Sequence, residues 1–523
     1  MPDVTEANAP RPARKRRAFT LAQMVVERRR AAISFGVGLI VLLLIQIPTI
    51  EQSFLGAPDR EMMQTAFRLR ADITGGVAEP VLFMDVDDRT LNRLAPPTTG
   101  VTPPLATTPR AAIADLLDFM RTAPPATAPR VVVMDVDIAQ PASDGPDGVA
   151  RLKTALAAWA GSKTAPPLII ARETYPATAL GIDRPQPALP DTPYDAIVQP
   201  APNIFWSEPS VQADLNGVIR EFLPYLCVIS SHDPNEAPRP LYSTALLAYQ
   251  FAERDQNALD HAPARHWMTE AASYCQTRSA MPLRHGERID FHISLERGFL
   301  GRVWPDLSPA WPGFRQCGHE DPAIFRRLSV IDILDAVHSG GDVSRALLCQ
   351  HVVIIGGTSA GASDFVQTPL NEMNGSVVLA NAIRGLQISH GGLRPIPLIL
   401  QVLLLLMVSL LISMSNLATA QARHRYRRLR RSVHKAKFSR RLAIIPLNPI
   451  ILNGLIALSA QCLGVGLLMV SLDFGFWGFL SAPVYASAIT ETLQEFSSCQ
   501  AQQDFPRRGC ARHVRIGWPD ARL

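Results

Sequence analysis

Residues 80–94 read PVLFMDVDDRTLNRL, and residues 129–138 read PRVVVMDVDI. Each stretch holds a short apolar run that ends at an Asp-x-Asp sequence. A short run of this kind, rich in β-branched or aromatic side chains and ending at polar residues, predicts a strand buried on both faces. Strands buried on both faces belong to parallel sheets that helices cover on each side. These two stretches therefore favour an α/β fold.

The rest of the central region alternates between helix-like and strand-like patterns. Apolar residues recur at helical spacing in 111–122, 151–161, 329–340 and 376–386. Further apolar, strand-like runs occupy 166–175 and 350–357, with a short candidate strand at 291–294. We therefore predict an extracytoplasmic mixed or parallel sheet flanked by helices. The stretch 176–209 carries eight prolines. Since Pro has no N–H for a sheet or helix, we expect a meandering surface insert there that tolerates substitution.

Four uncharged hydrophobic runs predict membrane spans. About 20 apolar residues cross the hydrocarbon core of a bilayer. The runs that meet this requirement, or approach it, give predicted transmembrane helices at 31–50, 395–418, 442–472 and 474–490. A cleaved signal peptide is the alternative interpretation of the first run, with Leu55-Gly56-Ala57 as the nearest cleavage site.

Two clusters of positive charge set the orientation. Lys and Arg crowd the tail at 1–30 and the loop at 419–441. Short basic segments stay on the cytoplasmic side, so residues 51–394 are predicted to lie outside the cytoplasm. The tail 491–523 then returns to the cytoplasm. The formal net charge of +5 comes mostly from these clusters. It indicates topology and contact with anionic membrane lipids, and it excludes a nucleic-acid-binding role.

Four of the seven cysteines fall in the predicted extracytoplasmic segment, where disulfides persist. Cys227 and Cys349 adjoin apolar runs and are expected to be buried thiols, whereas Cys275 and Cys317 stand in polar sequence and are the expected pair. The other pairings stay open, since four cysteines allow three connectivities. The chain has no C-x-x-C sequence, so we predict neither a metal site nor a cofactor.

The acidic residues at the ends of the two opening strands are the first candidate site. They are Asp85, Asp87, Asp88, Asp135 and Asp137. Ligands of open α/β sheets collect outside the carboxyl ends of strands, and paired carboxylates also suit a hard cation. The alternative is structural, because Asp side chains cap helices and fix loops.

Two further patterns invite a functional interpretation. In 214–220, Asn-Gly predicts a tight turn that brings Asp214 close to Arg220, for structural pairing or for ligand contact. Gly357 to Gly361 form a G-x-S-x-G sequence after a strand, the context of a serine nucleophile. This segment is similar to the Gly-Thr-Ser-Ala-Gly-Ala stretch of cyanophycinase-type serine peptidases. The alternative is a tight glycine turn, because no histidine stands in a recognisable partner motif.

Taken in order, these segments resemble the CHASE group of extracellular sensory domains, second type, which accompany bacterial cyclases and histidine kinases. The resemblance rests on the two acidic strand ends, on the corner from Asp214 to Arg220, and on a closing block, 352–383. It implies that further residues contribute to a ligand site: Arg110, Asp364, Thr368 and Asn381. The Pro/Thr repeats before Arg110 replace a Trp-Pro stretch that is usual in the group.

The resemblance implies a bacterial inner-membrane protein whose large periplasmic sensor domain binds a ligand or a protein. By analogy it also implies a homodimer. Because the tail at 491–523 is too short for a kinase or cyclase domain, we expect no enzyme activity and a separate cytoplasmic signalling partner. An envelope scaffold without a ligand switch is one alternative. A periplasmic serine hydrolase using Ser359 is the other.

Overall fold

The computed structural model describes most of residues 57–403. The described segments are 57–73, 81–94, 108–139, 144–253, 263–277, 287–293, 325–339, 348–359 and 365–403, with short internal gaps, and parts of 25–44, 405–414 and 465–477. The chain divides into two compact units. One comprises 64–395 with 469–477, and the other comprises 1–63, 396–468 and 478–523. The sheets lie in the first of these units.

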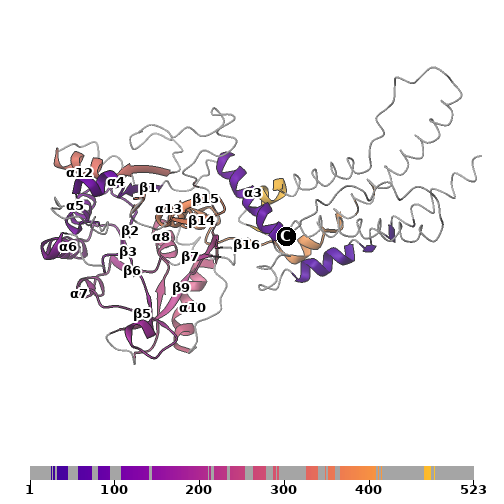
Figure 1. Cartoon of the computed structure of the whole chain (residues 1–523), viewed down its shortest axis with the longest axis horizontal. Helices are drawn as coiled ribbons and strands as arrows, with labels where there is room; N and C mark the ends of the chain where they lie inside the picture. Colours follow the sequence, from indigo (N-terminus) through magenta and orange to yellow (C-terminus); the bar gives the residue numbers. More distant parts are fainter. Residues whose placement is uncertain are drawn as a thin grey trace, which may run out of the picture. The chain divides into compact units, whose positions relative to one another are not determined.

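A six-stranded sheet forms the centre of this unit, and all of its strands run parallel (Figure 1). Its order is β12 (Phe325–Ser329), β1 (Val81–Asp85), β13 (Val352–Gly356), β2 (Val131–Asp135), β3 (Leu168–Ala171) and β6 (Ile204–Ser207). The two strands that carry the Asp-x-Asp sequences are therefore not neighbours, because β13 lies between them. The predicted α/β class, with a parallel sheet flanked by helices, is confirmed.

Helices cover both faces of this sheet. On one face lie α4 (Asp88–Leu94), α5 (Arg110–Arg121), α6 (Gly145–Ala160) and α12 (Val330–His338). On the other lie α8 (Thr244–Ala252) and α13 (Gly375–Ile388), which pack against each other and against the central strands. This two-sided cover explains why the central strands are apolar at every position rather than at alternate ones.

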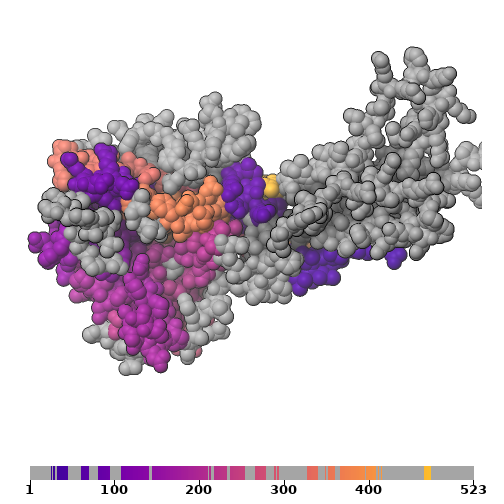
Figure 2. All heavy atoms as spheres, viewed as in Figure 1, coloured from indigo at the N-terminus to yellow at the C-terminus, as the bar shows by residue number. Residues whose placement is uncertain are grey.

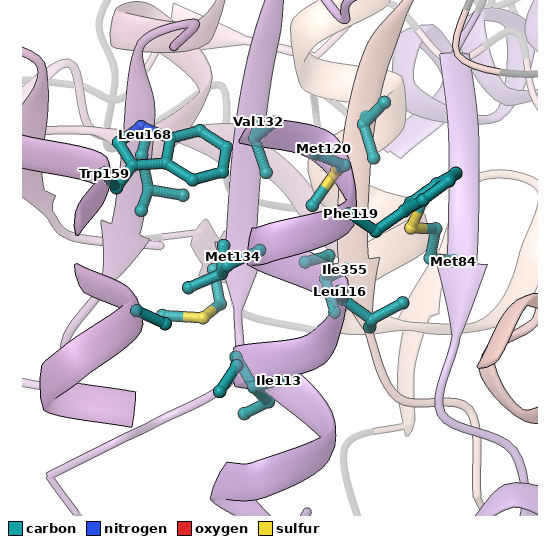
Figure 3. Packing of buried hydrophobic residues seen from close by; sticks show 14 of the residues in the cluster. Met84, Ile113, Leu116, Phe119, Met120, Val132, Met134, Trp159, Leu168 and Ile355 are labelled. Atoms are coloured by element: carbon teal, nitrogen blue, oxygen red, sulfur yellow. The ribbon is translucent and has the colours of Figure 1, made fainter. Parts of the chain in front are cut away.

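Alternation along the strands decides which side chains meet which helices. Met84, Met134 and Ile355 point into the core under α5 and α6, and Trp159 of α6 lies in the same core beside Leu168 of β3 (Figure 3). The Trp159 indole N–H donates to the carbonyl of Pro166 at 2.9 Å, so a buried polar group is satisfied at the edge of the core. Burying side chains of this size stabilises the fold by about 1.5–3 kcal/mol each.

The proline-rich stretch is not the meander that its composition predicts. It contains β4 (Tyr175–Pro176), the 3-10 helix η1 (Ala177–Leu180), β5 (Pro187–Leu189), α7 (Asp195–Val198) and the sheet strand β6. Arg172, at the end of β3, ties it down through an ion pair with Asp195 at 2.8 Å. The Arg172 guanidinium also lies 4.8 Å from the ring centre of Trp206. Proline is tolerated because these strands are short and Pro187 begins one of them.

Two smaller sheets complete the unit. One has the order β10 (Arg239–Tyr242), β9 (Tyr225–Ser230), β5 and β4. The other has the order β11 (Glu287–Arg288), β8 (Ile219–Phe222) and β7 (Val211–Ala213). Two short pairs also form, β14 (Phe365–Thr368) with β15 (Asn371–Asn374), and β16 (Arg394–Pro395) with β17 (Phe476–Trp477).

A disulfide joins Cys227 of β9 to Cys275 of helix α10 (Pro263–Thr277). The predicted pairing of Cys275 with Cys317 is therefore wrong, and Cys227 is not a free thiol. The polarity of the flanking sequence misled the prediction. The segment around Cys275 forms a helix whose cysteine is 1% exposed, so the cysteine faces β9 rather than solvent. Cys317 and Cys349 lie outside the described residues.

Helix α3 (Ala57–Ile73) approaches the β14–β15 hairpin, and the two surfaces lie side by side in Figure 2. Arg68 donates from Nε to the carbonyl of Pro369 at 3.0 Å and from Nη2 to the side-chain oxygen of Asn371 at 3.3 Å. This contact fixes the hairpin that precedes α13.

Within the part of the chain that the structure describes, no helix has both the length and the hydropathy needed to cross a bilayer. The predicted spans at 442–472 and 474–490 lie mostly outside that part, and those at 31–50 and 395–418 are described only in part.

Candidate functional site

The carboxyl ends of β1, β13 and β2 meet in one row at the edge of the sheet. Asp85 lies opposite Gly356, and Gly356 lies opposite Asp135. The neighbouring residues of these strands belong to the core under α5 and α6. Because side chains alternate along a strand, all three positions of the row face the layer of α8 and α13. This edge is where ligands of open α/β sheets bind, so the row is the candidate site.

Asp85 closes one end of the row as a fully engaged carboxylate, only 1% exposed. Its Oδ2 lies 2.6 Å from Nε and 2.5 Å from Nη2 of Arg327, on the neighbouring strand β12. Its Oδ1 accepts hydrogen bonds from the backbone N–H of Thr358 at 2.9 Å and from the Thr358 hydroxyl at 2.8 Å. The side chain of Arg327 is 40% exposed, so a buried carboxylate holds a cation at the surface of the edge.

Asp135 closes the other end of the row with far less support. Its Oδ2 accepts a hydrogen bond from the hydroxyl of Ser376, in the first turn of α13, at 2.6 Å. Burial raises the pKa of Asp135, and the Ser376 hydrogen bond offsets only part of that effect. Because Asp135 is half-buried, keeping its carboxylate ionised costs less than it would in a fully enclosed site.

Gly356 makes room between the two aspartates for the start of α13. A Cβ added at Gly356 would lie 2.2 Å from Oγ of Ser376 and 3.2 Å from the ring of Phe83. The glycine is thus required for Ser376 to reach Asp135. Asn374 begins the helix by accepting a hydrogen bond from the Ser376 backbone N–H at 3.0 Å.

Asp87 is a helix cap, as the structural alternative for the acidic residues proposes. Its Oδ1 accepts hydrogen bonds from the backbone N–H of Thr90 at 2.8 Å, from the Thr90 hydroxyl at 2.7 Å and from Ser329 at 3.0 Å. Burial alone would raise the pKa of Asp87, but these hydrogen bonds and the charge of Arg327 together hold it below its usual value. Asp88, the first residue of α4, is exposed.

Arg110 and Asp137 form a second, enclosed polar cluster next to the row. Arg110 is 1% exposed and donates from Nη2 to the backbone carbonyl of Asp137 at 2.9 Å. Burial lowers the pKa of Arg110, while Tyr194, Asp137 and Asp144 act in the opposite direction. Asp144 accepts a hydrogen bond from the backbone N–H of Ala111 at 2.8 Å and so caps α5 from a distance. This cluster positions the start of α5 rather than presenting charge at the surface.

Residues 36–415 match the family described as the CHASE2 domain. The chain belongs to this family. Comparison with curated proteins and with solved structures found no match. CHASE2 domains are extracellular sensory domains rather than catalytic ones, so membership agrees with a sensory role.

The remaining landmarks of the CHASE2 domain lie apart from the row. The Thr368 hydroxyl donates to the carbonyl of Asn371 at 2.6 Å and shapes the β14–β15 turn. The side chain of Asn381 bonds both backbone groups of Ile293, at 2.7 Å and 3.0 Å, and so anchors the segment around Ile293 on α13. The described residues of 291–294 form no strand, contrary to the sequence prediction.

The corner from Asp214 to Arg220 is described only at its end. Arg220 lies in β8 of the three-stranded sheet, and its carbonyl accepts a hydrogen bond from the N–H of Ile289 at 2.8 Å. Asp214 and Asp364 lie outside the described residues, so the predicted pairing of Asp214 with Arg220 stays a prediction.

Ser359 lacks the surroundings of a nucleophile among the described residues. It is 2% exposed, whereas a nucleophilic serine must be open to its substrate. His351 precedes β13, at the opposite end of that strand, and its Nδ1 lies 2.9 Å from the carbonyl of Leu348. The geometry gives no support to the hydrolase alternative.

Sequence reasoning missed Arg327, Thr358 and Ser376, which are the partners of the two aspartates. Arg327 belongs to FRRLS at 325–329, whose two arginines obscure the pattern of a buried strand. Thr358 lies within the G-x-S-x-G sequence, and Ser376 lies in the first turn of α13. The one available signal was their placement directly beside a strand end or a helix start.

Proposed function

We propose that this protein is an inner-membrane sensor whose CHASE2 domain lies in the periplasm and binds a ligand or protein at the carboxyl-edge row. The convergence of Asp85, Asp135 and Arg327 at the carboxyl edge of a parallel sheet, in a chain of a sensory family, carries this proposal. Arg327 is the partly exposed cation of the row, so it is the residue that we expect to contact a bound partner first.

Two observations support the periplasmic location. The disulfide between Cys227 and Cys275 suits an oxidising compartment, since cytosolic thiols are kept reduced. The basic clusters at 1–30 and 419–441 lie next to the hydrophobic runs on either side of residues 51–394. Both clusters favour a cytoplasmic position, which places the segment between those runs on the other side of the membrane.

We further propose that the signal leaves the domain through the segment after α13 and reaches a separate cytoplasmic protein. The basic loop at 419–441 offers that protein a docking surface beside anionic lipids. Signalling of this kind requires an equilibrium between two conformations of the domain. A ligand shifts that equilibrium only if it binds the two conformations with unequal affinity. A homodimer would let two such domains act on one partner.

Alkaline phosphatase, which is active only after export, tests the orientation when fused after Ala201 and, as the matched control, after Arg430. We expect activity from the first fusion and none from the second. In cells that express the full chain, alkylation under non-reducing conditions should leave Cys227 and Cys275 unmodified, because the disulfide protects both. Activity from the Arg430 fusion alone would contradict the proposed location.

A further inference from the structure

The start of α13 packs on Gly356, which lies between the carboxylates of Asp85 and Asp135. These two carboxylates differ in the hydrogen-bond donors and positive charge that surround them. Asp85 has a guanidinium and two donors from Thr358. Asp135 has one hydroxyl donor, Ser376, and that donor belongs to α13 itself. The only described side-chain hydrogen bond of Asp135 therefore connects the sheet to this helix.

Among the described residues, the charged groups on the elements packed around Asp135 are either distant from it or paired with other groups. On the β1 side, Asp85 lies two strands away, about 10 Å, and is paired with Arg327. On the β3 side, Arg172 is paired with Asp195. Helix α8 has no charged residue.

The helix α13 has one charged residue, Arg384, more than two turns beyond Ser376. On β2 itself, Asp137 lies past the strand end and accepts a hydrogen bond from the N–H of Ala139 at 2.9 Å. The guanidinium of Arg110 lies beyond it, bonded to the Asp137 carbonyl at 2.9 Å and acted on by the charges of Asp137 and Asp144. Asp135 consequently gains or loses a proton with little interference from other described groups.

The far end of α13 is the route from this row to the segment that precedes the predicted span at 395–418. Every residue from Ser376 to Gln387 is buried. The helix ends in a sharp left-handed corner, with φ of 51° at His390, 102° at Gly391 and 138° at Gly392. A buried helix held this tightly moves as a unit, because packed interiors do not deform continuously.

We propose that Asp135 and Ser376 form a proton-operated latch, in which Asp135 takes up a proton from solvent on acidification and α13 docks more firmly on the sheet. In the ionised state the carboxylate accepts the Ser376 hydrogen bond but bears the cost of burial. In the protonated state that cost is removed and the acid group also becomes a donor. The use of this latch in signalling rests on the proposed sensory function.

The sign follows from linkage. Burial raises the pKa of Asp135 in the folded state above its unfolded value. The folded state therefore binds the proton more tightly, and stability rises as the pH falls through the folded pKa. Asp135→Asn mimics the protonated form, so it should stabilise the protein at neutral pH and remove this part of the pH dependence.

The experiment compares the full chain in detergent micelles with Asp135→Asn and with the control Asp183→Asn, which removes an exposed carboxylate. At about pH 7.5, Asp135→Asn should melt about 2–4 °C above the parent chain, and the difference should vanish on acidification toward the unfolded value of about 3.9. Hydrogen exchange of the peptide 375–388 should slow in Asp135→Asn at about pH 7.5, while a peptide from α5 stays unchanged. Asp183→Asn should follow the parent chain in both measurements.

Ser376→Ala supplies an independent check, since losing the only described donor should make the pH dependence of melting steeper. Equal melting of Asp135→Asn and the parent chain at about pH 7.5, or a Ser376→Ala variant with unchanged pH dependence, would overturn the latch. The outcome is separate from the proposed function. If the phosphatase fusions contradict the proposed orientation but Asp135→Asn still melts higher than the parent chain, the sensor proposal fails and the latch stands. If the fusions agree but the melting difference is absent, only the latch fails.

Discussion

Asp85 and Asp135 end two strands of nearly the same sequence, occupy the same row of the sheet and have opposite environments. Asp85 is held by Arg327 and Thr358, and Asp135 by Ser376 alone among the described residues. The difference arises from the neighbours, because β12 brings an arginine to one side and α13 brings a hydroxyl to the other. One sequence motif therefore yields a structural anchor and a titratable group at the same edge.

The largest expected effect comes from removing the anchor. Asp85→Ala leaves the Arg327 guanidinium and the Thr358 donors without their acceptor. We expect a loss of about 3 kcal/mol in the free energy of unfolding, at the low end for a broken ion pair because Arg327 keeps contact with water. Asp135→Ala should cost less than 1 kcal/mol, roughly one hydrogen bond, since it also removes a disfavoured charge. Chemical denaturation followed by tryptophan fluorescence measures both, and equal losses would abolish the contrast.

An intermediate effect is expected at the glycine between the two aspartates. Gly356→Ala places a methyl group 2.2 Å from Ser376 Oγ and 2.7 Å from Ser376 Cβ. Overpacking of this kind costs about 1–3 kcal/mol, and it should push Ser376 away from Asp135. The control is Gly161→Ala, where the nearest atom lies 3.5 Å away in ordinary contact. Similar melting temperatures for the two variants would show that α13 is not seated closely on the row.

The smallest expected effect concerns Asp87, whose contribution to stability should change with pH in the opposite direction to that of Asp135. Asp87→Ala removes the cap of α4 and should cost about 1 kcal/mol. Because the folded pKa of Asp87 is lowered, its contribution is present above the unfolded value of about 3.9 and disappears as the pH falls through the folded value. Unfolding at about pH 6 and about pH 3 should show a smaller loss at the lower pH. Asp88→Ala is the control, because Asp88 lies at the same end of α4 but is not the capping residue. An equal loss of stability there would refute the assignment of Asp87 as the cap.

The sequence predicts the layers of the fold well because the strands are apolar throughout and the helices carry clear apolar faces. β1, β2, β3 and β13 were all visible as buried runs. β12 was not, because Arg326 and Arg327 interrupt its apolar pattern at the edge of the sheet. β6 was hidden within a proline-rich stretch, since composition does not reveal an anchor such as the pairing of Arg172 with Asp195.

The site was predictable in place but not in detail. The strand-end rule located Asp85 and Asp135. Their partners come from segments more than 200 residues away in the chain, and pairing over such distances leaves no local pattern. For the same reason the sequence could not choose Cys227 as the partner of Cys275, which depends on how α10 packs against β9.

The interleaved strand order has a consequence for biosynthesis. β1 and β2 emerge early, yet each borders β13, which is made only near the end of the domain. The two strands must therefore wait with open hydrogen-bonding edges until residues 352–356 arrive, and such edges invite aggregation. A nascent chain of this protein has reason to need a holding chaperone until translation has passed Gly356.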